Sequence, residues 1–176
     1  MKAKLGVLCA LLGLVVNAQA AIFLKLDDVL GESQARGHEN EIEILSWAFA
    51  MSNSGTAATA GGAGAGKVTF QDLSLTKLAD TATPVLMLST ANGKVYKQAI
   101  LTLERAGERP FVYYRVTMEN VIVTSVSTGG SGAESRPTES ISLNFAKVKV
   151  EYIPMKADGG AGTPVVFTWN LATNTP

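Results

Sequence analysis

Apolar residues recur at every second position through most of this chain after residue 20. Ile22, Leu24 and Leu26 form the first such set, and a repeat of two places alternate side chains on one face of a β-strand. Further apolar runs predict strands at residues 42–51, 68–73, 95–103, 112–126, 141–152 and 165–171. The pattern therefore predicts a protein made mostly of half-buried strands.

The alternation changes phase at Leu45, between Phe70 and Leu73, and between Phe145 and Ala146. A phase change turns the apolar set to the other face unless the strand bulges or twists. Long bent strands of this kind curl a sheet toward a barrel. The fold class predicted is all-β, a curled antiparallel β-barrel or sandwich of two sheets with about seven to nine strands. The strand order does not follow from the pattern.

One short α-helix is predicted to flank this sheet, near residues 84–91. Thr83 is a suitable N-cap, Pro84 suits the first helical position, and Asn92-Gly93 supplies a left-handed stop. We expect a helix of about two turns.

The first twenty residues have the pattern of an export signal. Two lysines precede an apolar run at residues 5–16, and Ala18-Gln19-Ala20 is a small-residue cleavage pattern. The run is short for a membrane span, although a retained membrane anchor is the competing interpretation. The expected organisation is a signal peptide at 1–20 and one β-domain at 21–176, without stable membrane insertion.

Composition limits the classes of partner. The chain is 47% hydrophobic and 17% charged, with a formal net charge of +0 and one cysteine, which describes one soluble globular domain. The balance of charge gives no basic footprint, so nucleic acid is not an expected partner. Cys9 lies inside the signal, so the mature domain is expected to be stable without a disulfide.

The glycine-rich run Gly61-Gly62-Ala63-Gly64-Ala65-Gly66-Lys67 has the spacing of a phosphate-binding loop up to its lysine. Such a loop needs Ser or Thr after the lysine and must lead into a helix. Val68 follows instead and opens a strand pattern. We interpret the run as a flexible or packed loop and expect no nucleotide or other cofactor.

Catalytic and metal-binding candidates are sparse. His38 is the single histidine, and no serine lies in a nucleophile elbow, so His38 is interpreted as a solvated or interface imidazole. Carboxylate pairs of the glycosidase kind stay open for Glu41 with Glu43 and for Glu134 with Glu139. No metal-ligand spacing is found. We therefore predict no enzyme, and a structural or binding role is the default.

A series of local patterns, taken in order, resembles the haemolysin-coregulated protein (Hcp) family of type VI secretion systems. The resemblance covers nearly all of the chain after the signal. The patterns are Leu24-Lys25-Leu26, Val29-Leu30-Gly31-Glu32-Ser33, His38, Glu41-Ile42, Trp47, Gly66-Lys67-Val68, Gln71-Asp72-Leu73-Ser74, Thr76-Lys77, Asp80, Pro84, Leu86, Ser125-Val126-Ser127-Thr128-Gly129-Gly130-Ser131-Gly132, Glu134, Glu139 and Leu143-Asn144-Phe145-Ala146.

This resemblance implies a non-enzymatic subunit whose copies form hexameric rings that stack into a tube. The partners implied are other copies of the chain, a spike protein, a contractile sheath and effector proteins. The alternative is an exported monomeric binding module, an adhesin or carbohydrate binder with the same fold. Subunit contacts are expected in two loops, at Gly61, Gly62, Gly64 and Gly66, and at Thr128, Gly129, Gly130 and Glu134.

The export signal bears on location. The resemblance implies assembly in the cytoplasm, whereas the signal predicts a secreted or extracellular protein that passes through the periplasm. Cytoplasmic assembly is expected instead if the start site is misassigned. The fold and ring formation are expected in either case.

Overall fold

A computed structural model of the chain describes residues 20–55, 67–105, 107 and 109–176. Strands predominate, and α1 is the one helix within these ranges. The predicted all-β class is confirmed. In chain order the elements are β1 (Ala20–Leu26), β2 (Ile42–Glu43), β3 (Ser46–Ala48), β4 (Met51–Asn53), β5 (Val68–Phe70), β6 (Leu73–Leu78), α1 (Thr83–Asn92), β7 (Val95–Arg105), β8 (Phe111–Gly129), β9 (Thr138–Tyr152) and β10 (Val165–Asn170).

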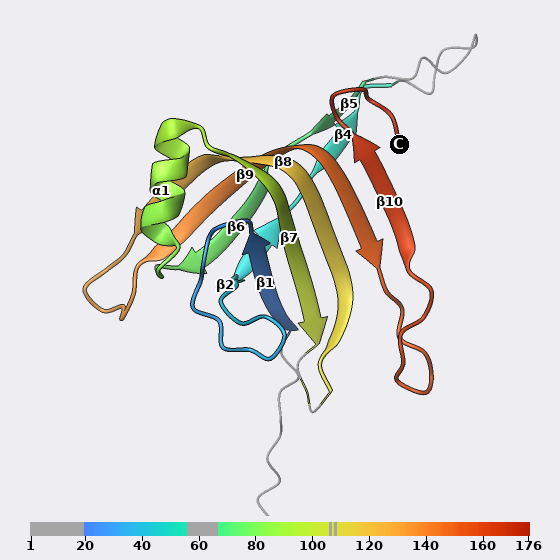
Figure 1. Cartoon of the computed structure of the whole chain (residues 1–176), viewed down its shortest axis with the longest axis horizontal. Coiled ribbons are helices and arrows are strands. Elements are labelled where there is room, and N and C mark those ends of the chain that lie inside the picture. Colours follow the sequence, from blue (N-terminus) through green and yellow to red (C-terminus); the bar gives the residue numbers. More distant parts are fainter. Residues whose placement is uncertain (1–19, 56–66, 106, 108) are drawn as a thin grey trace, which may run out of the picture.

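Eight of the strands form one antiparallel sheet in the order β2-β1-β7-β8-β9-β6-β3, with β10 paired to β9. β4 and β5 form a separate two-stranded ladder. The long strand β9 pairs with β6 over residues 138–143 and with β10 over residues 147–152. The large sheet curls into a half-barrel, with α1 beside one end and β10 at the other (Figure 1).

The core lies on one face of this curled sheet. Leu24, Leu101, Met118 and Leu143 are completely buried there, and Leu86 of α1 belongs to the same cluster. Burial of apolar side chains is the main favourable term in folding. The helix is therefore held against the sheet by its packing.

A bend crosses the two longest strands at the same level, as the phase change near Phe145 predicted. On β9 the buried set passes from Phe145 to Val148, and on β8 it passes from Met118 to Val121. Asn120 lies between the two halves of β8 with φ +53°, a left-handed conformation that asparagine tolerates better than most residues. The bend therefore has a residue of suitable type at its centre.

Residues 42–51 are not one strand, contrary to the prediction. They are divided among β2, β3 and β4, which pair with β1, β6 and β5 respectively. Leu45 is exposed between β2 and β3, and Phe70 and Leu73 end one strand and begin the next. A chain that leaves one partner strand for another turns between them, and alternation cannot distinguish that turn from a bulge.

α1 is confirmed close to its predicted position. Gly93 has φ +67° and donates its N–H to the Ser89 carbonyl, closing the helix as expected. The predicted cap is wrong, because Ala82 is the N-cap and Thr83 is the first helical residue, with its hydroxyl turned to Glu139. Over the described ranges, no helix has the length and apolar character needed to span a membrane.

Candidate functional site

One of the two predicted contact loops can be located. Gly61, Gly62, Gly64 and Gly66 fall outside the described residues. The residues of the second loop lie where β8 ends and in the hairpin that joins it to β9. All four are exposed, and they are Thr128, Gly129, Gly130 and Glu134.

α1 turns apolar side chains toward solvent on the side away from the core. Val85, Met87 and Leu88 are 38%, 44% and 63% exposed. We call these three residues the helix surface. The hairpin of the second loop extends from the same end of the half-barrel (Figure 1), so an apolar and a polar candidate contact region lie at one end.

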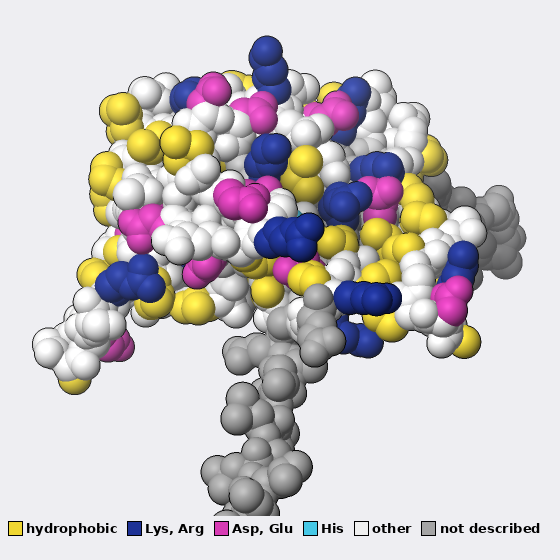
Figure 2. All heavy atoms as spheres, turned by 60° about the horizontal axis from the view of Figure 1, so that its bottom comes forward, with side chains coloured by type: hydrophobic (Ala, Val, Ile, Leu, Met, Phe, Trp, Pro, Cys, Tyr) yellow, Lys and Arg dark blue, Asp and Glu magenta, His cyan; other side chains and the backbone are white. Residues whose placement is uncertain are grey.

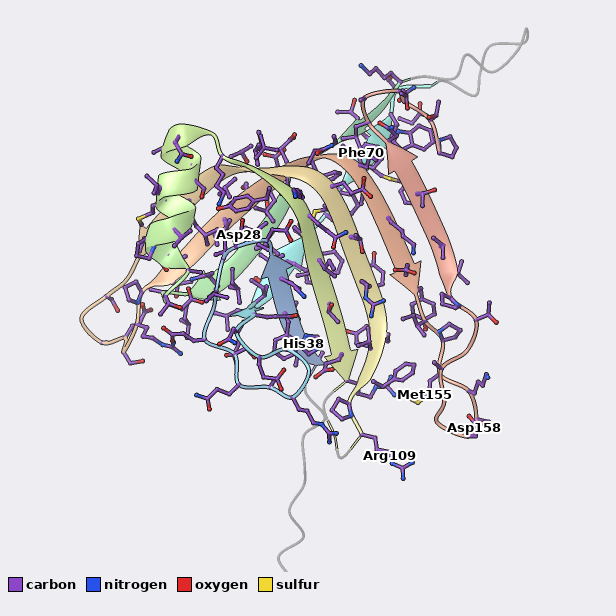
Figure 3. The ribbon with its side chains drawn as sticks, viewed as in Figure 1. Asp28, His38, Phe70, Arg109, Met155 and Asp158 are labelled. Atoms are coloured by element: carbon purple, nitrogen blue, oxygen red, sulfur yellow. The ribbon has the colours of Figure 1, made fainter. Side chains whose placement is uncertain are left out.

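A second apolar region lies where β9 ends and β10 begins. Tyr152 and Val165 are directly paired across the two strands, and Met155 follows in the connecting loop. Tyr152, Val165 and Met155 are 53%, 68% and 42% exposed, and we call them the strand surface. Figure 3 places Met155 beside Arg109 and near Asp158, at the end of the sheet away from α1.

The helix surface and the strand surface thus lie toward opposite ends of the molecule. Figure 2 shows basic and acidic side chains interspersed over the face between, with hydrophobic side chains toward both ends. Exposed apolar regions rimmed by polar residues are typical of protein–protein contacts.

A third surface consists of small, mostly hydroxyl-bearing side chains. It lies on the face opposite the core, where β3, β6, β9 and β8 run side by side. No side chain in its two cross-strand rows is charged. One row is Ala48, Ser74, Ser142 and Ser125, and the other is Ser46, Thr76, Ser140 and Ser127. We call these eight residues the hydroxyl face.

Two charged residues are buried where β6, β9 and α1 meet. The side chains of Lys77 and Glu139 are completely buried, with Lys77 Nζ 2.8 Å from Glu139 Oε2. Lys77 Nζ is also 2.6 Å from Asp80 Oδ1. Thr83 and Thr128 donate hydroxyl hydrogen bonds to Glu139, at 2.7 Å and 3.0 Å. The cluster fixes the start of the helix and the end of β8 to the same point of the sheet.

Burial disfavours the charged form of Glu139, but the hydrogen bonds from Lys77, Thr83 and Thr128 and the positive charge of Lys77 outweigh it. Together they hold the pKa of the Glu139 carboxyl below its ordinary value. Glu139 is therefore an ionised, paired carboxylate rather than a general acid.

Sequence analysis missed this cluster, although the strand pattern contains a signal for it. Lys77 continues the inward alternation of Leu73 and Leu75, and Glu139 begins the inward alternation that Ile141 continues. A charged residue in an inward position implies a buried partner. Two such positions on neighbouring strands would have predicted the pair.

His38 lies at a second, smaller cluster, in the loop between β1 and β2 (Figure 3). Its ring stacks on Phe23 with centroids 4.2 Å apart. Nδ1 is 2.7 Å from Glu41 Oε2 and Nε2 is 3.5 Å from Glu104 Oε2. The imidazole is packed and only 12% exposed, which contradicts the solvated alternative of the prediction, and the interface alternative stays a prediction.

The carboxylates of the two pairs left open by the sequence have different surroundings in the structure. Glu139 is bound in the buried cluster, and Glu134 is exposed in the hairpin. Glu41 Oε2 lies within hydrogen-bond distance of His38 Nδ1, while Glu43 is exposed on β2. Within the described part of the chain, no group of three metal-ligating side chains could hold a metal ion.

Comparison with known proteins gives concordant matches. Residues 23–152 match the family described as type VI secretion system effector, Hcp. Protein hcp1 of Pseudomonas aeruginosa is 50% identical over 155 residues, which are 87% of this chain and 96% of that protein.

Solved structures agree. A type six secretion system protein has a TM-score of 0.83 at 29% identity, covering 89% of this chain and 99% of its own. Hcp1 from Salmonella typhimurium has a TM-score of 0.73 at 34% identity, covering 89% and 97%.

Proposed function

Because this chain belongs to the Hcp family of type VI secretion proteins, we propose that it is a structural subunit that forms hexameric rings, and that the rings stack into a tube that carries effectors. The role is non-enzymatic. Other copies of the chain are its first partners, and a spike protein, a contractile sheath and effectors are the further partners proposed.

The observation that carries the proposal is the pair of apolar surfaces at opposite ends of one subunit. A ring of identical subunits needs two different, complementary surfaces on each copy, joined head to tail with a rotation that closes. The helix surface offers Leu88, 63% exposed, and the strand surface offers Val165, 68% exposed. Each contact between two subunits (a joint) would bury one helix surface and one strand surface, which removes apolar area from water.

The hydroxyl face is proposed as part of the wall of the central channel. Its two rows point away from the core and contain no charged side chain. Such a face offers hydrogen bonds to many passengers and strong electrostatic binding to none. A passenger could be held there and released without a specific ion pair having to break.

The test is the mass in solution of residues 21–176, measured by light scattering coupled to size exclusion, with electron micrographs of the main peak. Six copies in a ring are expected. Leu88→Asp and Val165→Asp are each expected to give monomers, because each places a charge in a buried joint. A wild-type chain that stays monomeric at high concentration would instead favour an exported binding module.

A matched control separates contact from folding. Leu45 is 56% exposed and lies outside both apolar surfaces, so Leu45→Asp makes the same chemical change elsewhere. Rings that persist in Leu45→Asp and disappear in Leu88→Asp support the proposed joint. Loss of rings in all three variants with intact circular dichroism would contradict it.

The place of assembly is proposed from the leader. With residues 1–20 acting as an export signal, the subunit is secreted through the periplasm and assembles outside the cytoplasm. The N-terminal residue of the chain recovered from each compartment tests this. Recovery of an unprocessed chain from the cytoplasm alone would place assembly there.

A further inference from the structure

The cluster around His38 carries more negative than positive charge. Glu41 and Glu104 both turn a carboxylate to the one imidazole, and their side chains are 15% and 10% exposed. Even when it is protonated, His38 supplies one positive charge beside two carboxylates. A largely buried carboxylate without a cation is costly, and among the described residues His38 is the one ion-pair partner of Glu104.

Ala21 lies directly opposite Glu104 in the ladder between β1 and β7. Phe23, on the same face of β1, lies opposite Thr102 and beneath the His38 ring. Directly opposed residues on one face have Cβ atoms about 5 Å apart. Ala21 is therefore the residue of β1 that lies on the Glu104 side of the cluster.

The cations of β1 and β7 are placed away from the Glu104 carboxylate. Lys25 shares the face of Ala21 and Phe23 but pairs with Ile100, at the other end of β1, and is exposed. Arg105 follows Glu104 on β7, so its side chain points to the opposite face. The Glu104 end of the cluster lacks a cation from either strand.

We propose that removal of residues 1–20 supplies this cation, because the α-ammonium group released at Ala21 pairs with Glu104 and completes the His38 cluster. In the uncut chain that nitrogen is a neutral amide. Hydrolysis of the Ala20–Ala21 bond consumes one water, leaves a carboxylate on Ala20 in the departing leader, and leaves the protonated amine on Ala21. Processing thus stabilises the single subunit, whatever its assembly.

The test begins with the full chain expressed for export and purified from the periplasm. Mass spectrometry is expected to find Ala21 as the first residue, and any other first residue overturns the proposal. The α-amino group is then acylated selectively near neutral pH, and urea unfolding is compared before and after. Acylation is expected to lower the folding equilibrium constant about fivefold, as for a partly buried ion pair.

Two variants identify the partner of the amine. In Glu104→Gln, acylation is expected to have no effect on the unfolding midpoint. In the control Glu119→Gln, which removes an exposed carboxylate on β8, the fivefold loss is expected to remain. An equal loss in Glu104→Gln, or no loss in the natural chain, overturns the proposal.

A second measurement needs no variant, in case Glu104→Gln does not fold. The acylation rate of the α-amino group is compared in native buffer and in urea. A paired ammonium is expected to react at least about fivefold more slowly in the folded chain. Equal rates overturn the proposal.

Discussion

Lys77 and Glu139 compensate each other inside the sheet. Each is surrounded by apolar neighbours on its own strand, and the two meet with Asp80 and Thr83 at the start of α1. Replacing such a pair by apolar residues is often tolerated, whereas removing one partner leaves an uncompensated charge. Because Asp80 Oδ1 also lies 2.6 Å from Lys77 Nζ, the three charged groups are expected to act as one unit in any mutational test.

Glu139→Gln is expected to destabilise the domain by about 1–3 kcal/mol, because Lys77 keeps Asp80 as its one carboxylate partner and the Thr83 and Thr128 hydroxyls lose an ionised acceptor. Urea unfolding at pH 7 measures the loss. Glu119→Gln is the control, since Glu119 is 49% exposed and pairs with Lys147 at 3.3 Å; it should cost less than about 1 kcal/mol. Similar losses in both variants would contradict the role given to the buried pair.

The pH dependence of stability has a definite sign at this residue. The pKa of Glu139 is lowered in the folded chain, so its ionisation stabilises the fold above the unfolded value of about 4.3. That stability is lost as the pH falls through the lowered folded pKa. Urea midpoints measured from pH 7 to pH 2 should fall more steeply for the natural chain than for Glu139→Gln; parallel curves would count against the assignment.

Gly31 is required by a close approach of two backbone segments. A Cβ added there would lie 2.3 Å from the Glu41 carbonyl oxygen, which is far inside contact distance. Gly31→Ala is expected to cost about 1–3 kcal/mol by overpacking, measured by thermal unfolding. Gly132→Ala is the matched control, because nothing lies within 4 Å of its added Cβ. A stable Gly31→Ala would mean that the loop shifts freely.

At the scale of elements, Asn120 lies at the bend that crosses the two longest strands of the half-barrel. A β-branched residue is strained at the φ of +53° found there, whereas glycine is not. Asn120→Val should therefore cost about 1–2 kcal/mol, and Asn120→Gly should be close to neutral. Chemical denaturation of the two variants gives the comparison. Equal stability would show that the bend has another cause.

Much of this element structure could be predicted from alternation. β1, β7, β9 and α1 were expected near their observed positions because each has a clear period or stop signal. The break at Leu45 could not be distinguished from a bulge, since both change the phase of the same pattern. The register shift between Val123 and Ser125 was missed because the hydroxyl residues around it give no contrast between the faces.

The candidate surfaces were less predictable than the fold. The hairpin at Gly129 and Gly130 was chosen from its glycines and from the resemblance, and its contacts remain a prediction. The helix surface was missed, because apolar residues on a short helix are expected to face the core. Only the packing of α1 on the sheet shows that Leu86 is buried while Leu88 is exposed.

At the scale of the whole molecule, the proposed ring separates two kinds of surface. The apolar surfaces are buried at joints, whereas the hydroxyl face stays in contact with solvent. Ser74→Lys is therefore expected to leave both the ring peak and the unfolding midpoint unchanged, because a lysine on a channel wall remains hydrated. Size exclusion with light scattering checks this. A shift of Ser74→Lys to monomers would place the hydroxyl face in a joint instead.

The position of Ala20 in β1 has a consequence for the order of events in an exported chain. Ala20 and Ala21 pair with Arg105 and Glu104, so the bond to be cut lies within a docked strand of the finished sheet. A peptidase needs that segment extended and free, and β7 is synthesised long after β1. The proposed leader removal would therefore compete with long-range strand pairing, which is slow because a large loop must close first. Late pairing of β1 would leave the Ala20–Ala21 bond accessible to the peptidase for longer.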